Sequence, residues 1–539
     1  MSVDDVASHP PASPPQPPAQ PPEFKTLLGH PRPLWMLFMT EFWERFAFYG
    51  IRWALVLYIV AQFHGGQGSG QASASATYGA YLALVYAAAI FGGYVADRVL
   101  GYQRSILVGA AVMATGLFMI AVPNQQVFEL GLSTIIVGNG LFKPNISAMV
   151  GKLYSVADPR RDSGFTIFYM GINIGAMVSP VLTQMLAEKV FGTVAMPSYK
   201  MVFIASGIGM LISLLWFFVG RAQLKGIGAA FPGTGGSGRV IAVLAGCVFA
   251  VPVIYFVLGG ALARYVADAL MSLGWLHPVH VQGVLNYEKT LAAATVLAWI
   301  LGAIFIALSV MLLVEGVRNG KVARDKVIAM LIIFAFNVLF WMFFEQAGSS
   351  FTFLADEIVN RQFGDWTFPT AWFQSVNSLA IITLAPVIAW IWVKAGRFNP
   401  SISRKFALGL GFNGLAFLLL MFALSSLVND AGKIPFWTLF MVYVIQSVGE
   451  LCLSPIGLSM VTKLAPLRLV GFGMGGWFLS TGIGNNLSGI FASHVSGKDG
   501  MTVSSALGGY TFGFWALLGS GVLLFLIAPL ISKLMHGVK

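Results

Sequence analysis

The chain has few charged residues. Asp, Glu, Lys and Arg make up 10% of its 539 residues, whereas 57% are hydrophobic. Soluble globular proteins carry about 25% charged residues, so this composition excludes an ordinary soluble domain. We therefore expect a polytopic membrane protein that is all α-helical.

Cysteine and histidine are scarce as well. The two cysteines, Cys247 and Cys452, lie in apolar stretches far apart in the sequence, which excludes a disulfide framework and a cysteine metal site. The seven histidines stand in the tail, in connections or near segment ends, so a membrane-embedded metalloenzyme lacks obvious ligands. We expect no bound metal, no cofactor and no enzymatic activity.

Two further absences concern charge clustering and the N-terminus. The net charge is +11, but the basic residues are scattered between apolar segments, which excludes a nucleic-acid surface. Residues 1–24 are rich in Pro, Ala, Ser and Gln and hold almost no large apolar residues, so they cannot bury a core. We predict a disordered cytoplasmic tail there and no secretory signal peptide.

What the chain has in abundance is apolar segments of about 20 residues or more, the length that crosses a bilayer. Fourteen of them run roughly from 33 to 62, 78 to 97, 104 to 122, 127 to 150, 164 to 187, 201 to 221, 239 to 262, 290 to 314, 327 to 347, 370 to 393, 405 to 427, 436 to 460, 469 to 492 and 509 to 532.

The distribution of basic residues predicts the orientation of these segments. With the N-terminus inside, 22 of the 32 Lys and Arg fall in cytoplasmic connections and tails and seven fall outside. Positive residues concentrate on the cytoplasmic side of membrane proteins, so we expect both termini in the cytoplasm. Three basic residues remain within the membrane, namely Arg45, Arg52 and Lys143.

The first segment holds the densest group of membrane-embedded charges, in the stretch EFWERFAFYGIR from Glu41 to Arg52. Successive residues of an α-helix are rotated by about 100° around its axis. Five residues of this stretch therefore lie on one face, within an arc of roughly 100°: Glu41, Arg45, Phe48, Tyr49 and Arg52. Glu44 lies at the edge of this face. Intramembrane ionisable groups are costly and usually mark an ion or substrate pathway.

Two more membrane acids, Glu345 and Glu450, bring the total to four acids against three bases. Such near-balance is what mutual neutralisation in an apolar interior would produce. The plain alternative is that these groups form fixed ion pairs that only align helices.

The first connection with a family motif reads GYVADRVLGYQR, from Gly93 to Arg104. It resembles the loop motif of the major facilitator superfamily, in which glycines permit close packing and a tight turn, and Asp97 can cap or pair at the cytoplasmic side. A weaker echo, GRFNPSISRK from Gly396, is expected if two six-helix halves arose by duplication.

Further motifs narrow the resemblance. Together with EFWERFAFYG, six stretches in both halves resemble the proton-coupled oligopeptide transporter family: GLFKPN, GFTIFYMGINIGA, FWMFFEQAGSS, WFQSVN, GELCLSPIGLS and GGWFLSTGIGNN. The resemblance implies a major facilitator fold with a six-helix half at 28–222, a linker with an inserted two-helix hairpin at 223–320 and a second half at 321–539. It thus implies fourteen transmembrane helices.

The resemblance also implies roles for individual residues. Glu41, Glu44 and Arg45 match the family motif that couples proton movement to transport. Twelve further residues match the family positions that contact the substrate: Arg52, Tyr49, Tyr86, Lys143, Asn173, Trp341, Glu345, Asn377, Glu450, Ser454, Trp477 and Phe478. Two ion pairs are expected to act as gates, Arg52 with Glu345 and Lys143 with Glu450.

This chain differs from the usual family pattern in two ways, at Phe48 and in the absence of histidine from the second segment. Many members have two tyrosines before the glycine of the first motif, where this chain has Phe48 and Tyr49. No histidine lies within the second segment, so carboxylates must carry the proton.

The resulting expectation is a proton-coupled symporter for di- and tripeptides in the bacterial inner membrane. It is expected to act as a monomer, by alternating access, with Pro144, Pro386 and Pro455 as weak points of their helices. Two alternatives stay open at this stage. A drug exporter of the same superfamily would share the loop motif, and a peptide receptor that does not transport would retain the binding charges.

Overall fold

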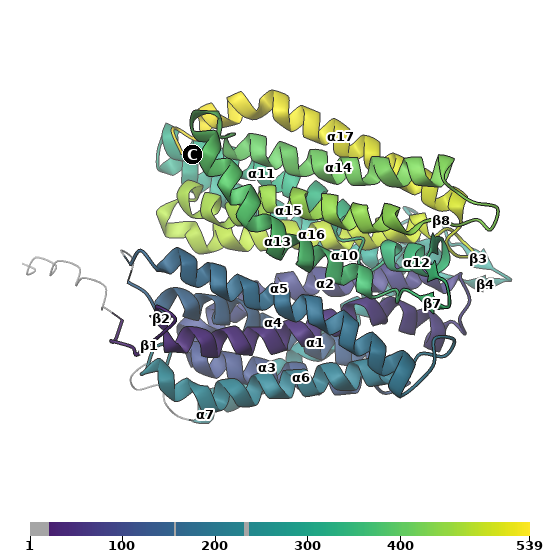
Figure 1. Cartoon of the computed structure of the whole chain (residues 1–539), viewed down its shortest axis with the longest axis horizontal. Coiled ribbons are helices and arrows are strands. Elements are labelled where there is room, and N and C mark those ends of the chain that lie inside the picture. Colours follow the sequence, from purple (N-terminus) through teal and green to yellow (C-terminus); the bar gives the residue numbers. More distant parts are fainter. Residues whose placement is uncertain (1–20, 156–157, 231–236, 539) are drawn as a thin grey trace, which may run out of the picture.

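The computed structural model describes residues 21–155, 158–230 and 237–538. Within these ranges, fourteen helices have 18 residues or more and run along one common direction (Figure 1). They are α1 (Arg32–Phe63), α2 (Gly70–Val95), α3 (Tyr102–Met119), α4 (Gln125–Lys152), α5 (Arg161–Met185), α6 (Tyr199–Gly220), α7 (Ser237–Leu258), α10 (Ala293–Arg318), α11 (Lys321–Phe344), α13 (Trp372–Ala395), α14 (Ile402–Ser426), α15 (Phe436–Leu464), α16 (Val470–Val495) and α17 (Val503–Leu534).

Eleven helices of the described chain are long and apolar enough to cross a membrane, which makes this a multi-pass membrane protein. The remaining three long helices, α3, α4 and α16, are not among these eleven and lie inside the same bundle. Helices satisfy their own backbone hydrogen bonds, as a bilayer interior demands. The fourteen predicted segments each have a matching helix, while the count of fourteen membrane crossings stays a prediction.

Short elements join the long helices. The helical ones are η1 (Ala96–Leu100), η2 (Leu186–Val190), η3 (Arg221–Leu224), α8 (Ala261–Ser272), α9 (Tyr287–Thr290), α12 (Ser350–Glu357), η4 (Gly396–Phe398) and η5 (Leu467–Leu469). The strands are β1 (Thr26–Leu27), β2 (His30–Pro31), β3 (His280–Val281), β4 (Val284–Leu285), β5 (Val359–Asn360), β6 (Gln362–Phe363), β7 (Trp366–Thr367) and β8 (Ile434–Pro435). Pairing is antiparallel for β1–β2, β3–β4 and β6–β7 and parallel for β5–β8, where Val359 is opposite Ile434.

Two groups of six long helices form the bundle. Helices α1 to α6 make the lower half in Figure 1, and α11 with α13 to α17 make the upper half. The inserted pair touches both halves, because α7 packs against α4 whereas α10 packs against α11 and α16. We call the end of the bundle where β1, β2 and the C-terminus lie the termini side, and the opposite end the far side (Figure 1).

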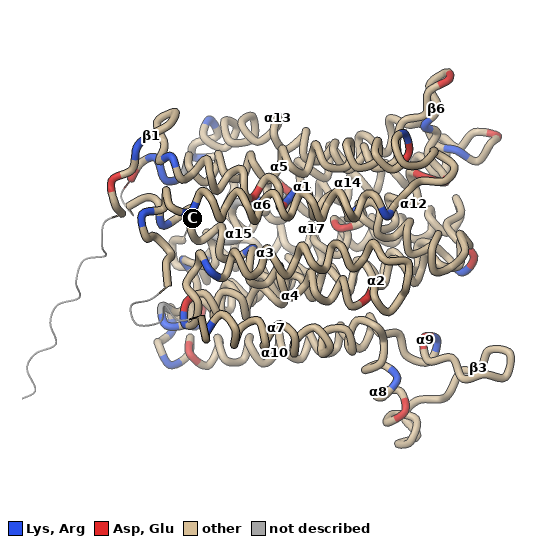
Figure 2. The backbone as a smooth tube through the Cα atoms, turned by 90° about the horizontal axis from the view of Figure 1, so that it is seen from below, with Lys and Arg blue, Asp and Glu red and all other residues tan. Residues whose placement is uncertain are grey.

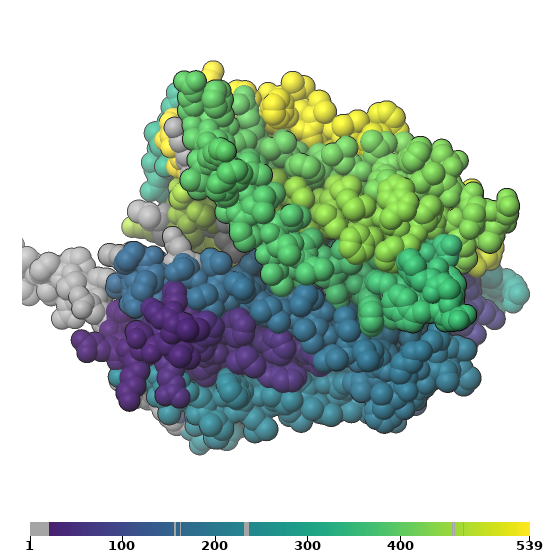
Figure 3. Space-filling model, in the orientation of Figure 1, coloured from purple at the N-terminus to yellow at the C-terminus, as the bar shows by residue number. Residues whose placement is uncertain are grey.

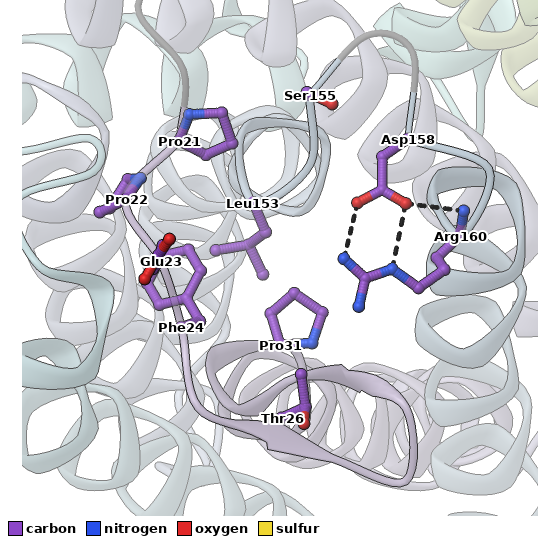
Figure 4. A pocket seen from close by; sticks show the side chains of 10 residues that line it. All are labelled: Pro21, Pro22, Glu23, Phe24, Thr26, Pro31, Leu153, Ser155, Asp158 and Arg160. Carbon is purple, nitrogen blue, oxygen red and sulfur yellow. Dashed lines mark hydrogen bonds and ion pairs between the residues drawn. The ribbon is translucent and has the colours of Figure 1, made fainter.

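The first described residues are packed rather than extended away from the protein. Lys225 Nζ donates a hydrogen bond to the Glu23 carbonyl at 2.5 Å, and Phe24 packs against the core. Residues 21–31 form one wall of a hollow whose other wall is the connection from α4 to α5 (Figure 4). The predicted disordered tail 1–24 stays a prediction, because residues 21–24 have no secondary structure and residues 1–20 lie outside the described residues.

That connection carries an ion pair outside the membrane-spanning segments. Arg160 donates to the Asp158 carboxylate from Nη2 at 2.8 Å and from its backbone N–H at 2.9 Å (Figure 4). The hydrogen bonds hold the pKa of Asp158 below its usual value. Arg160 also donates to the Gly29 carbonyl at 3.1 Å, which ties the β1–β2 turn to this connection.

The two halves meet along α2 with α16 and α5 with α13. Near the far side the contact is close and polar, because Gln71 Oε1 accepts the Met501 N–H at 2.9 Å and Gln184 Oε1 accepts the Ala371 N–H at 2.8 Å. Toward the termini side α13 leans away from α5, as Figure 3 shows on the surface. Trp390 of α13 is 57% exposed there. The bundle is thus closed at the far side and splayed at the termini side.

Closure at the far side depends on glycine packing between α2 and α16. A Cβ atom on Gly79 would lie 2.6 Å from Gly489 Cα and 2.8 Å from the Asn485 carbonyl oxygen, closer than real side chains approach backbone. Glycine at both positions lets the backbones touch, which is how small residues promote helix association in membranes.

We predict that Gly79→Ala widens the far side, because the added methyl group pushes α2 from α16. The measurement is the distance between spin labels at Gln67 and Lys498, two exposed residues in the contacting far-side loops. A shift to longer distances is expected. Gly411→Ala is the control, since a Cβ there meets nothing within 4 Å. Unchanged distances in Gly79→Ala would contradict the prediction.

Candidate functional site

Most charged residues lie at the two ends of the bundle, and few lie along its middle (Figure 2). Helix α1 is the exception, because Glu41, Glu44, Arg45 and Arg52 are all buried within it, none more than 7% exposed. The helix is continuous through these residues. Each buried charge must therefore find its partners from side chains, since an unpaired charge in an apolar interior costs several kcal/mol.

The first group of charges is the triplet Glu41, Glu44 and Arg45. Arg45 pairs with both oxygens of Glu44 through Nε and Nη2, and its Nε lies 3.3 Å from Glu41 Oε1. From α4, Asn139 Nδ2 lies 3.5 Å from Glu44 Oε1. The second oxygen of Glu41 is buried and has no hydrogen-bond partner among the described residues. Glu44 is thus held twice by the guanidinium, and Glu41 once.

The second group links the two halves. Arg52 Nη2 pairs with Glu345 Oε1, as the sequence predicts for these two residues. Tyr78 on α2 sits between them, since its hydroxyl accepts from Arg52 Nε at 3.0 Å and donates to Glu345 Oε1 at 3.3 Å. The guanidinium also lies over the Tyr49 ring, 5.3 Å from its centre.

Glu345 stands at a break in its helix. Helix α11 ends at Phe344, and the chain makes turns from residue 345 to 349 before α12 begins. The Glu345 carbonyl accepts a hydrogen bond from Ser488 Oγ of α16 at 3.0 Å. The predicted segment 327–347 overruns the end of α11 by three residues and so includes the start of this turn.

The second expected ion pair, Lys143 with Glu450, is wrong for this conformation. Lys143 Nζ lies over the Tyr86 ring, 4.2 Å from its centre, in a cation–π contact within the first half. No ion pair within 4 Å joins Lys143 and Glu450 in the described chain. The physical reason is that α4 and α15 belong to different halves, which separate toward the termini side.

Glu450 has neutral partners instead. Asn377 Nδ2 of α13 donates to Glu450 Oε2 at 3.2 Å and to Ser447 Oγ at 2.8 Å. The Glu450 carboxylate is within electrostatic range of Glu345 and Arg52. It therefore faces the same region as the inter-half pair, with no cation in direct contact among the described residues.

The remaining predicted residues divide into two sets. Tyr49 and Tyr86 lie against buried cations, because the Arg52 guanidinium lies over the Tyr49 ring and Lys143 Nζ over the Tyr86 ring. Others are committed to packing or to local bonds. Trp341 Nε1 donates to Asn337 Oδ1 at 3.1 Å, the Asn173 amide donates to the Tyr169 carbonyl at 3.0 Å, and Trp477 is 6% exposed between Phe334 and Phe406.

Ser454 and Phe478 complete the predicted set. Ser454 Oγ is buried without a hydrogen-bond partner among the described residues, and Phe478 is partly buried against the core of the second half. The roles assigned to these residues stay predictions.

Sequence reasoning missed two groups that the structure places at the buried charges, the Tyr78 hydroxyl and the Asn139 amide. It also missed the two far-side glutamines, Gln71 and Gln184, which accept backbone N–H groups across the seam between the halves. Asn139 was within reach of the sequence, because an amide in mid-segment needs partners. Tyr78 was not, because an aromatic residue at the start of a segment is typical of an interface position.

A multi-helix bundle in two halves, with ionisable groups buried at their shared seam, defines a membrane transporter. Comparison with known proteins narrows this class. The model of the POT family matches residues 103–505. The chain is 33% identical to an uncharacterised transporter, YclF, of Bacillus subtilis, over 95% of this chain and 97% of the relative.

Other matches agree. The peptide transporter YePEPT of Yersinia enterocolitica is 34% identical over 87% of this chain and 89% of its own. A crystal structure of a peptide transporter POT with sulfate has a TM-score of 0.76 at 31% identity, covering 95% of this chain and 97% of that one. The chain belongs to the POT family, which confirms the resemblance drawn from the motifs. It is a transporter and not an enzyme.

We predict that Tyr78→Phe weakens the inter-half link, because it removes the hydroxyl that bridges Arg52 and Glu345. Hydrogen bonds to charged groups contribute about 1.5–3 kcal/mol, so thermal unfolding in detergent should occur at a lower temperature.

Tyr81→Phe is the matched control. Tyr81 is equally buried on the same helix, but its hydroxyl has no hydrogen-bond partner among the described residues. If both substitutions lowered the melting temperature equally, the bridging role of Tyr78 would be refuted.

Proposed function

We propose that this chain is a proton-coupled symporter that imports di- and tripeptides by alternating access. The observation that carries the proposal is that one helix face holds both a proton-accepting triplet and a charge bound to the opposite half. Arg45 of the triplet and Arg52 of the inter-half pair are seven residues apart, or about 10 Å along α1. Occupancy of one group can therefore bias the other.

The peptide as substrate is supported by the relatives and by the charges. One relative is named a peptide transporter, and another, 32% identical, is the dipeptide and tripeptide permease B of Edwardsiella piscicida. A small peptide is a zwitterion. Arg52 and Lys143 suit its carboxylate, while Glu450, with only neutral direct partners, suits its ammonium group. The partly buried aromatic rings of Tyr49 and Tyr86 suit variable side chains.

The proton step is assigned to Glu41. Glu44 is bound to Arg45 through two oxygens, whereas Glu41 has a single contact at 3.3 Å and one unpartnered oxygen. A proton on Glu41 would remove little attraction to Arg45 and would lower the cost of burying an oxygen that has no hydrogen-bond partner among the described residues. The pair of Glu41 and Glu44 around one guanidinium thus keeps Arg45 neutralised whether or not Glu41 is protonated.

The gate step follows from the inter-half pair. When the transporter is open at the far side, Arg52 and Glu345 are apart, and protonation of Glu345 with peptide binding at Arg52 would neutralise both. Closure at the far side re-forms the pair, and the termini side opens to release the peptide. Pro144 in α4 and Pro386 in α13 interrupt backbone hydrogen bonds in two of the helices that must move.

The proposal also covers what drives transport and where the protein is located. The proton gradient drives the cycle without a cofactor. The protein sits in the bacterial inner membrane as a functional monomer, with both termini cytoplasmic in accord with the basic residues. The termini side is then the cytoplasmic side, and the conformation described above faces inward.

Reconstitution tests the symport. Vesicles with the purified protein and an inward proton gradient should accumulate labelled dialanine, and Glu41→Gln should abolish accumulation while exchange of dialanine across the membrane persists, because glutamine mimics the protonated acid. Glu129→Gln, at a partly buried acid of α4 bonded to Gln125, is the control and should accumulate normally. Uptake by Glu41→Gln at the control rate would refute the proton role.

A second experiment tests Glu450. Glu450→Gln should weaken binding of dialanine at least tenfold but leave binding of N-acetyl-dialanine nearly unchanged, because the acetylated peptide lacks the ammonium group. Isothermal calorimetry in detergent measures both. Equal losses for the two ligands would remove Glu450 from this role while leaving symport itself untouched.

A further inference from the structure

Helix α8 differs in direction from the long helices. It begins at Ala261, and two residues separate it from the end of α7 at Leu258. The turn between them is made at Gly260 with φ of +77°. Figure 2 shows α8 directed sideways from the ends of α7 and α10, roughly across the direction of the bundle helices. An apolar helix of 22 residues such as α7 is about 33 Å long. This length matches the hydrocarbon core of about 30 Å, so α8 begins at the bilayer surface.

The sequence of α8 has three faces. Ala263 and Ala267 are buried where α8 packs on α7 and α10. At about 100° per residue, a polar stripe and an apolar stripe lie on nearly opposite sides of the helix. The polar stripe is Arg264, Asp268 and Ser272, and the apolar stripe is Leu262, Val266, Leu270 and Leu273.

The polar stripe faces the outer elements of the insert. Arg264 lies over the Tyr287 ring of α9, 6.0 Å from its centre, and Asp268 raises the pKa of the Tyr287 phenol through a hydrogen bond. Both α9 and the β3–β4 hairpin lie farther out along the bundle direction than α8 (Figure 2). Because the polar stripe faces outward, the apolar stripe faces back toward the depth of the membrane.

The described protein covers the apolar stripe only in part and leaves its last residue and the turn that follows exposed. Leu273 is 62% exposed and Trp275 is 78% exposed, and the other stripe residues are partly exposed. Tryptophan is enriched at the level of the lipid head groups, where its apolar ring and N–H are both accommodated. An amphipathic helix in that plane buries its apolar face about 5–10 Å into the boundary.

We propose that α8 and the Leu273–Trp275 turn are an interfacial anchor that binds the bilayer leaflet on the far side. The bilayer is preferred to a protein partner because the polar face is already satisfied by α9 and because the apolar stripe faces the membrane from its surface. The anchor would hold the inserted pair α7 and α10 at a fixed depth while the two halves move. This inference does not depend on which solute is transported.

Spin labelling of the full-length protein in vesicles of phosphatidylethanolamine and phosphatidylglycerol tests the anchor. Cysteine replaces Val266, Leu270 or Trp275 in turn, and collisions of the label with oxygen, which enters lipid, are compared with collisions with a water-soluble nickel chelate. Oxygen collisions should exceed nickel collisions several-fold at all three positions. Protein without an added cysteine gives the background, since Cys247 and Cys452 are buried.

Two controls come from the same insert. Asp268→Cys reports the polar stripe, and Val284→Cys on β4 reports a residue that is 70% exposed, close to the exposure of Trp275, but lies on the outer hairpin. At both, nickel collisions should dominate.

Nickel access at Trp275→Cys equal to that at Val284→Cys would overturn the proposal. Dipolar broadening at Trp275→Cys that persists on dilution into lipid would also overturn it, because a second copy of the chain would then cover the stripe.

Discussion

The buried guanidinium of Arg52 is the constraint on which the arrangement of the two halves depends. It lies in the interior of a membrane bundle and cannot lose its charge, so it requires an acid and further hydrogen bonds. The fold provides the acid from the opposite half, Glu345, and the hydroxyl of Tyr78 beside it. The Arg52–Glu345 ion pair therefore stabilises the closed far side, and it must break when the two halves separate there.

The rest of the seam makes that interaction reversible. Glycines at positions 79 and 489 let α2 and α16 meet through backbone, and the two glutamines, Gln71 and Gln184, accept single backbone N–H groups. These contacts involve no interdigitated large side chains and can be re-formed after separation. The break of α11 at Glu345 places its carboxylate at a point where the helix is already interrupted, so its movement does not require the helix to unwind.

Helix α1 joins this inter-half ion pair to the buried triplet. The Glu41, Glu44 and Arg45 side chains and Arg52 share one face of a continuous helix, and Lys143 of α4 is within electrostatic range of Glu41, Glu44, Arg45 and Glu345. The two groups are about 10 Å apart along α1, and charges at that separation interact in an apolar medium. The insert stands apart from this system, packed on both halves and extending over the membrane surface by α8.

The sequence by itself determined the membrane class, the approximate positions of the long helices, the charged face of α1 and the family, because these depend on composition, local periodicity and motifs. The family resemblance implied the Arg52–Glu345 pair, but the tertiary structure alone decided the other contacts of the buried charges. It placed Tyr78 between Arg52 and Glu345, Asn377 on Glu450, and Lys143 on Tyr86 in place of Glu450. Such pairings join helices far apart in the chain, and they depend on how the halves pack in one conformation, which no local pattern contains.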